Sequence, residues 1–351
     1  MSVKPVTVPF FISHQGCPHT CVFCDQRVIS GADGCLPTAD QISEKIVRWR
    51  ETAGDRPVEV AFFGGTFTAL PEQAQAQLLA PLQPYRASGE IGSVRISTRP
   101  DYIDSGRVAW LAERGVRIIE LGVQSMDDAV LTASGRGHSA ADSLNAIRCI
   151  KEQGLRVGAQ LMPGLPGDTP ELSLDSLDQV ISAGSDFLRI YPTVVLQGTE
   201  LAQRYRTGEF VPLTLDRGIK LCKILLQRAL QADIPVIRIG LQADTGLNEN
   251  NIKAGCWHPA LGQLVRSQLY DDLVSHIVAD GEQVTVYCHP TRLSDVVGVA
   301  RGNVLKQMQR GVQMQVVPDA ALQADELRIR HNETDTTGSI ISDLHYSIHE
   351  V

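Results

Sequence analysis

The stretch GCPHTCVFCD, at residues 16–25, carries the three cysteines on which the fold assignment depends. Cys17, Cys21 and Cys24 are separated by three and by two residues. A loop with this spacing can wrap three thiolates around one face of a compact metal centre, and thiolates suit iron–sulfur chemistry. A 4Fe-4S cluster held in this way keeps one iron open for another ligand. The alternative is a structural zinc site, whose fourth ligand would be His14, His19 or a distant cysteine.

Short apolar runs alternate with helical stretches over the first 210 residues. Six runs rich in valine, isoleucine and phenylalanine predict buried parallel strands at 6–12, 58–63, 93–98, 117–123, 155–162 and 187–195. Helices are expected between them, near 39–52, 71–86, 103–114, 139–153 and 170–184. Strands that alternate with helices imply parallel βαβ units. Six such units predict an α/β fold, a partial TIM-type (β/α)6 barrel, with an open doubly wound sheet as the structural alternative.

The pattern changes after residue 210. Helices are expected at 213–232, 261–279 and 292–310, strands at 282–288, 312–317 and 326–330, and a loop-rich segment at 234–262. The polar stretch at 331–339 is expected to be exposed. We therefore expect three parts, namely a barrel, an extension of helices and loops, and a small α/β appendage, at 1–210, 211–278 and 279–351.

The composition excludes several classes of protein. Hydrophobic residues make up 43% of the 351 residues and charged residues 21%, which is ordinary for a globular chain and unlike a disordered or collagen-like one. No apolar run approaches the ~18 residues of a membrane span, so no membrane partner is expected. The first residues lack the pattern of a secretory signal, which predicts a cytoplasmic protein with reduced thiols. The net charge of −8 gives no overall attraction to nucleic acid.

Glycines and polar residues follow the second and third expected strands. In a parallel barrel the active site is built at the carboxyl ends of the strands. Gly64, Gly65 and Thr66 come after the second strand, where glycines let a ligand approach the backbone. A simple turn is the other interpretation. Arg99 follows the third strand and is suited to pair a carboxylate or phosphate, although most arginines are simply solvated.

Polar residues also mark the later strands. Gln124 ends the fourth strand, and Arg136 stands between two glycines twelve residues further on. Gln160 interrupts the apolar fifth strand, and Tyr191 closes the sixth. Each has a structural alternative, because a glutamine or a tyrosine in a core can satisfy its polar atoms on neighbouring groups. Together these residues predict a ligand site across the strand ends.

The cysteine segment resembles the signature of the radical S-adenosylmethionine (SAM) superfamily, C-x3-C-x2-C in the loop after the first barrel strand. This resemblance implies a 4Fe-4S cluster on Cys17, Cys21 and Cys24, with the open iron bound to the amino and carboxylate groups of SAM. An electron from the cluster cleaves the C–S bond of SAM, and the resulting 5′-deoxyadenosyl radical abstracts a hydrogen atom from the substrate. A low-potential electron donor such as flavodoxin or ferredoxin is implied as a partner.

The same resemblance assigns roles to the residues at the strand ends. The Gly-Gly turn matches the family's Gly-Gly-Glu-type motif, which contacts the SAM amino group. Arg136 would pair the SAM carboxylate, and two glutamines would serve the ribose side. The expected SAM-binding set is Gly64, Gly65, Thr66, Gln124, Arg136 and Gln160. Tyr191 and Arg99 are the candidate catalytic residues, with Tyr191 beside the substrate.

Four later motifs narrow the resemblance. ELGVQS, GRGH, MPGLPG and IYPT are similar to segments of the catalytic subunit of Elongator, from about residue 10 to about 210. That subunit modifies wobble uridines in tRNA through a radical SAM domain joined to an acetyltransferase domain. The chain after residue 275 is too short for such an acetyltransferase domain, so we do not expect the acetyl-CoA reaction. Oxygen-independent coproporphyrinogen oxidase is a more distant relative that shares Gly-Val-Gln-Ser and the cysteine spacing.

The predicted function is therefore that of a radical SAM enzyme that cleaves SAM reductively and modifies tRNA. Two alternatives remain at this stage. One is a porphyrinogen oxidase-like enzyme that acts on a small molecule. The other is a protein that binds a metal or an iron–sulfur cluster without catalysis.

The appendage carries a further resemblance. Gly298–Arg301 is similar to the G-x-x-G loop of a KH domain, which clamps an RNA backbone, with Arg301 in place of the second glycine. A plain β-α-β module that supports the barrel is the other interpretation. A basic strip for tRNA is expected from Arg292, Arg301, Lys306 and Arg310.

Two cysteine–histidine pairs elsewhere in the chain offer a second metal site. They are Cys256 with His258 and Cys288 with His289. Buried structural cysteines are the alternative interpretation.

Overall fold

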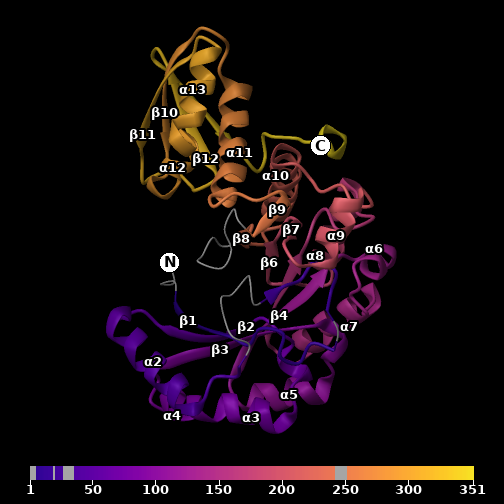
Figure 1. The fold of residues 1–351 in the computed structure, drawn as a ribbon. Coiled ribbons are helices and arrows are strands. Elements are labelled where there is room, and N and C mark those ends of the chain that lie inside the picture. The colour runs from indigo at the N-terminus through magenta and orange to yellow at the C-terminus, as the bar shows by residue number, and fades with distance from the viewer. Residues whose placement is uncertain (1–4, 19, 27–34, 242–250) are drawn as a thin grey trace.

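A curled seven-stranded sheet and a smaller four-stranded sheet lie at opposite ends of the molecule (Figure 1). The computed structural model describes residues 5–18, 20–26, 35–241 and 251–351. His19, an alternative zinc ligand, lies outside these residues. Among the described residues, no helix is long and apolar enough to cross a membrane.

The larger sheet confirms the predicted α/β fold class. Its strands run parallel in the order β1-β2-β3-β4-β5-β6-β8, with the bounds Val6–Phe11, Val58–Phe63, Ile91–Thr98, Val116–Gln124, Arg156–Leu161, Phe187–Ile190 and Val236–Ile239. This sequential order is that of a partial barrel, because a doubly wound sheet reverses its strand order part-way. The seventh strand, β8, corrects the expectation of a loop-rich segment at 234–262. Its four residues are too few for a clear apolar pattern.

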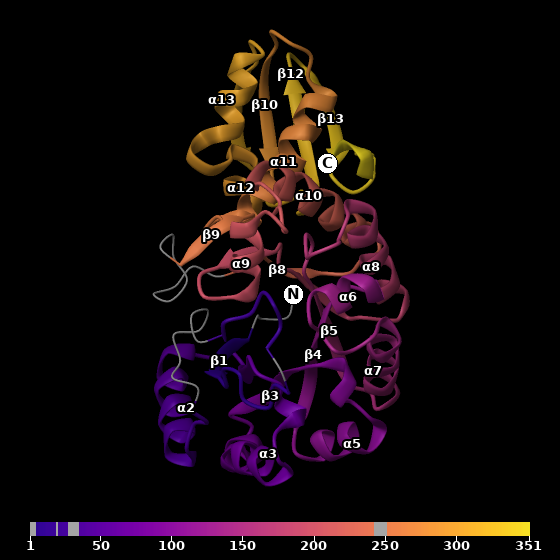
Figure 2. The same cartoon turned by 45° about the vertical axis from the view of Figure 1, so that its right-hand side comes forward.

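Helices follow the barrel strands and surround the sheet (Figure 2). They are α2 Ala39–Ala53, α3 Glu72–Leu79, α4 Gln83–Ala87, α5 Ser105–Glu113, α7 Ala140–Glu152 and α8 Pro170–Ser182. The single helix expected at 71–86 is divided into α3, a short 3-10 turn and α4. Pro81 and Pro84 explain the division, since proline removes a backbone donor and crowds the preceding turn. Two short helices were not expected, α6 Asp128–Ala133 and α9 Glu200–Thr207.

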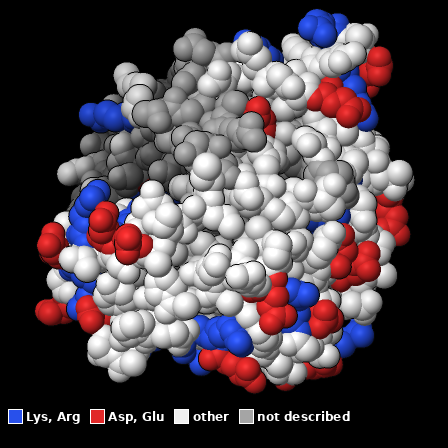
Figure 3. Space-filling view, turned by 60° about the horizontal axis from the view of Figure 1, so that its bottom comes forward, with Lys and Arg blue, Asp and Glu red and all other residues white. Residues whose placement is uncertain are grey.

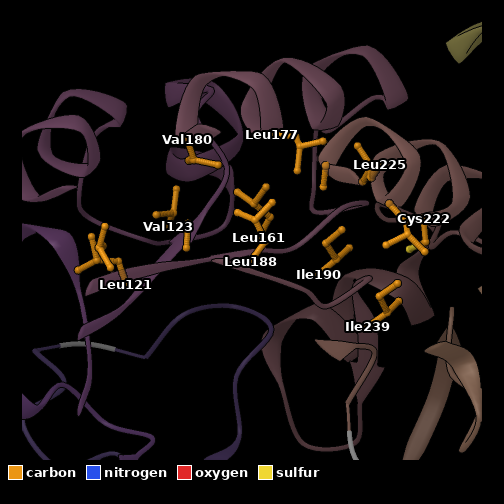
Figure 4. Close-up of a cluster of buried hydrophobic side chains, with 14 of the residues drawn as sticks. Leu121, Val123, Leu161, Leu177, Val180, Leu188, Ile190, Cys222, Leu225 and Ile239 are labelled. Carbon is orange, nitrogen blue, oxygen red and sulfur yellow. The ribbon is translucent and has the colours of Figure 1, made fainter. Parts of the chain in front are cut away.

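One face of the seven-stranded sheet forms the main core. Apolar side chains of the strands pack there against α8 and against α10 Leu215–Gln231 (Figure 4). The buried residues labelled in this cluster are Leu121, Val123, Leu161, Leu188, Ile190 and Ile239 from the strands and Leu177, Val180, Cys222 and Leu225 from the helices. Successive strand residues point to opposite faces, so the residues between these positions face the concave side of the sheet.

Two short strands form a separate antiparallel pair. β7 Val194–Leu196 pairs with β9 Ile252–Gly255. The strand expected at 187–195 is therefore two strands, β6 and β7, with Tyr191, Pro192 and Thr193 between them. Helix α11 Leu261–Ile277 then leads from the barrel into the four-stranded sheet.

The appendage is a four-stranded sheet with the order β11-β10-β12-β13. Its strands are β10 Gln283–Cys288, β11 Gln313–Pro318, β12 Glu326–His331 and β13 Thr334–Ser339. The polar stretch at 331–339 is largely exposed, as expected, and most of it forms the edge strand β13. Its threonines favour this strand, because threonine is a β-branched residue that suits strands despite its polarity.

The helix expected at 292–310 is broken in two. α12 Leu293–Val297 and α13 Gly302–Gln309 are separated at Gly298, whose φ is +82°. Ala300 and Arg301 also have positive φ, at 51° and 62°, which no helix interior tolerates. The loop Gly298–Arg301 thus joins two helices between β10 and β11.

Candidate active site

The concave face of the barrel sheet is polar. It carries Glu59, Arg95, Glu120, Gln160 and Arg189 at positions that alternate with the apolar core residues. An ordinary TIM barrel fills its interior with branched apolar side chains. Buried charges are unfavourable unless they are paired, so a polar interior is a feature of a barrel that holds ligands.

Ion pairs connect these charges across the sheet. Arg95 Nε lies 2.9 Å from Glu59 Oε1, and Arg95 Nη1 lies 2.5 Å from Glu120 Oε1. Arg189 contacts the same glutamate with Nε 2.9 Å from Oε2 and Nη2 3.0 Å from Oε1. Arg189 Nη1 donates to the hydroxyl of Tyr191 at 2.8 Å. The sequence analysis predicted no role for the two glutamates and two arginines, although their alternation with apolar residues is visible in the sequence.

The cysteine loop packs tightly on the Gly-Gly turn. The backbone N–H of Thr66 donates to Gln15 O at 2.8 Å. A Cβ atom on Gly65 would come within 2.3 Å of Gln15 O and 2.5 Å of Ile12 O, and one on Gly16 within 2.3 Å of Thr66 O. Both glycines also have positive φ. Only glycine fits at these two positions, which explains why each motif contains one.

Gln26 ties the same two segments together. Its Oε1 accepts the backbone N–H of His14 at 2.7 Å and that of Gly65 at 2.6 Å, and it lies 3.2 Å from the place of a Cβ on Gly64. The N–H of Gln26 donates to His14 Nε2 at 2.9 Å. This use of the imidazole makes His14 a poor candidate for the fourth ligand of a zinc site.

The three cysteines have the chemistry that a thiolate-ligated centre needs. Cys17 Sγ lies 3.6 Å from Thr66 Oγ1, and Arg136 Nη1 donates to Cys21 Sγ at 3.3 Å. Burial raises the pKa of Cys17, and burial together with the neighbouring Cys21 and Cys17 raises the pKa of Cys24 to about 12. Thiols this strongly disfavoured as free anions become thiolates when a metal centre supplies compensating charge.

Three thiols are the donor set that a 4Fe-4S cluster uses, whereas a closed zinc site needs a fourth ligand. Within the described ranges, no three His, Cys, Asp or Glu side chains are placed together to hold one metal ion. A zinc ion needs its ligands about 2.0–2.3 Å away on one point. Cysteines that bind separate irons of a cluster need no such convergence. The residues present therefore fit a 4Fe-4S cluster.

Arg136 and the two predicted glutamines meet around Gly122 on β4. Arg136 Nη2 donates to Gly122 O at 2.5 Å, and Gln160 Nε2 donates to Gln124 Oε1 at 3.1 Å. A Cβ on Gly122 would come within 2.9 Å of Gln124 Nε2 and 3.3 Å of Arg136 Nη2. Gln124 itself has a φ of +73°, which is rare for this residue and turns the strand end.

The loop between α6 and α7 places Arg136. Gly135 and Gly137 both have φ near +66°, and these glycines allow the tight turn that carries the guanidinium inward. The backbone N–H of Arg136 donates to Leu131 O at 3.0 Å, which fixes the turn on α6. The residue is only 6% exposed, so its guanidinium lies inside the barrel rather than in solvent.

Arg99 has a partner that the sequence reading did not assign. Its Nε and Nη2 donate to Asp101 Oδ1 and Oδ2 at 2.9 and 2.8 Å, in a bidentate pair. Arg99 is buried, whereas the side chain of Asp101 is 22% exposed and keeps contact with solvent. The guanidinium that we expected to meet a ligand carboxylate or phosphate thus binds a carboxylate of the chain, and its catalytic role stays a prediction.

His138 is a site residue to which the sequence reading gave no role. Its Nε2 lies 3.1 Å from Val123 O, beside Gln124. Burial lowers its pKa to about 3, and the positive charges of Arg136 and Arg99 act in the same direction. The imidazole is therefore neutral at neutral pH and donates to the end of β4. The GRGH motif was the available signal for this residue.

The structure does not support the second metal site. Cys256 Sγ points to Leu215 O at 3.9 Å, whereas Cys288 lies in the core of the appendage. His258 Nδ1 accepts from Ala260 N at 3.0 Å. Cys256 and Cys288 are 1% and 0% exposed, which favours the interpretation as buried structural cysteines.

The expected basic strip on the appendage is largely neutralised. Lys306 pairs with Asp271, Arg310 pairs with Asp280 at 2.8 Å, and Arg292 pairs with Asp295 at 3.4 Å. Only Arg301 among the four has no recorded ion pair within the described part of the chain. On the face shown in Figure 3, basic and acidic side chains of the described residues are intermixed around a largely uncharged centre.

Two family models match most of the chain. Residues 11–180 match the Radical SAM superfamily, and residues 185–271 match the Radical_SAM C-terminal domain. The chain belongs to the radical SAM superfamily. It is an enzyme of that superfamily, and the resemblance drawn from its cysteine spacing is confirmed.

Relatives of this radical SAM enzyme support the similarity to Elongator. The tRNA uridine(34) acetyltransferase of Methanocaldococcus infernus is 33% identical over 151 residues, which is 40% of this chain and 28% of that protein. Elongator complex protein 3 of Saccharomyces cerevisiae is 26% identical over 218 residues, which is 54% and 39% of the two chains. The chain thus spans about a third of the length of these curated relatives.

A solved structure supports the fold. The archaeal Elp3 of Methanocaldococcus infernus with an N-terminal deletion aligns with a TM-score of 0.62 and 23% identity, over 78% of this chain and 64% of that one. At this identity the similarity supports the radical SAM barrel and its C-terminal extension as a fold.

Proposed function

We propose that this enzyme binds a 4Fe-4S cluster on Cys17, Cys21 and Cys24 and cleaves SAM reductively for the modification of tRNA. When bound, the cluster supplies one electron to SAM, which separates into methionine and a 5′-deoxyadenosyl radical that takes a hydrogen atom from the substrate. The observation that carries the proposal is the contact of Arg136 with both Cys21 Sγ and Gly122 O, because it joins the cysteine loop to the strand ends.

Arg136 is proposed to pair the carboxylate of SAM. It is a buried cation next to the cysteines, and a buried anion needs such a partner. The backbone at Gly64, Gly65 and Thr66 would receive the amino group, since glycines leave the backbone open there. Its hydrogen bonds to Gln26 and Gln15 hold this turn in place before SAM arrives.

Gln124 and Gln160 would serve the ribose hydroxyls. Their amides are already paired with each other, so a ligand meets two oriented groups rather than two mobile ones. His138 contributes by holding the carbonyl of Val123 next to Gln124. A low-potential donor such as flavodoxin or ferredoxin would supply the electron.

The tRNA substrate rests on the relatives. The proteins named above as a tRNA uridine(34) acetyltransferase and as an Elongator component are similar to 40% and 54% of this chain. The polar concave face suits a polar substrate such as a nucleobase, which would leave the stack to enter the barrel. Because few exposed cations stand on the appendage, tRNA binding should be modest and should weaken steeply with salt.

The decisive experiment is anaerobic reconstitution with iron and sulfide. The wild type should bind iron and absorb near 400 nm, roughly where thiolate-to-iron charge transfer lies. The triple variant Cys17→Ala, Cys21→Ala, Cys24→Ala should lose both signals, whereas the exposed control Cys35→Ala should keep them. Full iron content in the triple variant would place the centre elsewhere.

Function is then tested with SAM and dithionite. Release of 5′-deoxyadenosine by the wild type supports radical chemistry, and its complete absence from a fully loaded enzyme contradicts it. A tRNA transcript should bind at low salt. An active enzyme that binds no tRNA would favour a small-molecule substrate instead.

A further inference from the structure

The ion pairs inside the barrel end at Tyr191. They run from Glu59 on β2 through Arg95 on β3 and Glu120 on β4 to Arg189 on β6. Glu59 and Glu120 are 1% and 6% exposed, so the chain of charges is shielded from water. Charges alternate along it, and each arginine lies against a glutamate. Tyr191 is the neutral last member, at the carboxyl end of β6 where ligands bind in this fold.

Two of the three guanidinium nitrogens of Arg189 contact Glu120, and the third donates to Tyr191. Its Nε and Nη2 take both carboxylate oxygens, and its Nη1 donates to the phenol oxygen at 2.8 Å. The guanidinium also lies over the ring of Phe63, 5.4 Å from the centroid. These contacts leave Arg189 little freedom, so they fix the position of the Tyr191 hydroxyl.

The direction of the hydrogen bond determines what the tyrosine offers. A guanidinium has no acceptor, so the oxygen of Tyr191 must accept from Arg189. Its own O–H proton is then directed away from Arg189. In the part of the chain that the structure describes, no recorded hydrogen bond uses this proton. The tyrosine thus presents an oriented donor at the mouth of the barrel.

This donor lies close to the proposed SAM site. Phe63, which Arg189 covers, directly precedes the Gly64-Gly65-Thr66 turn. A donor at this place suits an acceptor atom of the proposed substrate base. Carbonyl oxygens of a pyrimidine are such acceptors. Uracil carries an oxygen where cytosine carries an amino group, so one donor distinguishes the two bases.

We propose that Tyr191 donates a hydrogen bond to the O4 carbonyl of a uracil base in the barrel, and that Arg189 is the positioning residue that orients it. The proposal rests on the tRNA substrate proposed above. It makes Tyr191 a specificity-determining residue that favours uracil over cytosine.

The experiment compares two tRNA transcripts that differ only at position 34, with uridine or cytidine. Dissociation constants are measured at low salt with the loaded enzyme and SAM but without reductant, so no turnover is needed. The variants are Tyr191→Phe, which keeps the ring and loses the donor, and the control Tyr205→Phe on the exposed surface of α9. SAM affinity is measured in parallel for each protein.

The wild type and Tyr205→Phe should prefer uridine by about 3- to 10-fold, the effect of one hydrogen bond. Tyr191→Phe should bind both transcripts with equal affinity. Arg189→Lys should also reduce the preference, because a lysine ammonium cannot reproduce the fork that reaches Glu120 and Tyr191 together. The double variant Arg189→Lys, Tyr191→Phe should show the same preference as Tyr191→Phe alone. If Arg189 only stabilised the fold, the two substitutions would instead have separate effects.

The outcomes separate this inference from the proposed function. A wild type that discriminates together with a Tyr191→Phe variant that discriminates equally overturns the role of Tyr191 and leaves the tRNA substrate standing. Equal wild-type affinity for the two transcripts also overturns it. A wild type that binds no tRNA overturns the proposed substrate and this role together, while SAM cleavage is tested independently.

Discussion

The barrel sheet and the appended sheet use the same set of side chains in opposite settings. In the barrel, Arg95 lies between Glu59 and Glu120, and Arg189 pairs with Glu120. The two arginines lie over the rings of Phe187 and Phe63. In the appendage, Arg328 and Arg330 pair with aspartates and lie over the ring of Tyr287, at 4.5 and 5.4 Å. Both sheets thus carry arginines between acids and an aromatic ring on one face.

Burial separates the two arrangements. The barrel glutamates are almost fully buried, whereas the side chain of Arg330 is 45% exposed. An exposed ion pair contributes little, because water already solvates both charges. Removing one partner of a buried pair strongly destabilises the folded protein, because the remaining charge is left without a partner and without solvating water. The comparison teaches that the same contacts fix a site in one sheet and only cover a surface in the other.

The largest expected effect tests this difference directly. Glu120→Ala removes the acid that separates Arg95 and Arg189, and we expect it to lower the free energy of unfolding by about 3–5 kcal/mol. The control Asp335→Ala on β13 removes an acid from the exposed arginines and should leave the midpoint of urea unfolding unchanged. Equal shifts in the two variants would show that burial does not decide the outcome.

Arg136→Ala should weaken SAM binding by about 1.5–3 kcal/mol, the range for a hydrogen bond to a charged group. Titration of the reconstituted protein with SAM measures this change. Arg330→Ala in the appendage serves as the matched loss of an arginine and should leave SAM affinity at the wild-type value. An unchanged dissociation constant for Arg136→Ala would remove Arg136 from the SAM site.

His138 gives the barrel a pH dependence. Its folded pKa of about 3 lies below the ordinary value of 6.5, so between these values the unfolded chain binds more protons than the folded one. Its contribution to stability is therefore complete above pH 6.5 and is lost as pH falls toward 3. From pH 7 to 5 the loss should be about 2 kcal/mol. His138→Gln should reduce this pH dependence in urea unfolding, whereas His349→Gln, with a side chain 81% exposed, should not.

The smallest expected effect concerns a single added methyl group. Gly122→Ala places a Cβ 2.9 Å from Gln124 Nε2. The side chains of Gln124 and Arg136 must therefore shift, and the binding free energy of SAM should weaken by about 1 kcal/mol. Gly302→Ala in the appendage adds the same group where no atom lies within 4 Å. It should leave SAM affinity unchanged. Wild-type affinity in Gly122→Ala would show that Gly122 does not limit the SAM site.

Local patterns in the sequence predicted much of the barrel. The runs at 58–63 and 117–123 are strands because their valines and isoleucines bury well in a parallel sheet, and the neighbouring helices lie close to their expected bounds. The strand β8 was missed because its four residues derive their stability from pairing with β6. The break between α12 and α13 was also missed, since Ala300 and Arg301 carry no sequence signal for positive φ.

For the candidate site, too, some features follow from the sequence and others only from the tertiary structure. The sequence by itself determined which residues stand at the strand ends, because spacing within a loop and order along a strand are local properties. The spacing of Cys17, Cys21 and Cys24 and the place of Arg136 between two glycines are such local properties, and their roles stay predictions. Only the tertiary structure decided that Arg99 binds Asp101, that Lys306 is neutralised by Asp271 and that Arg189 reaches Glu120 across β5. Such pairs join separate elements, and the curl of the sheet determines which charges meet and how far water is excluded from them.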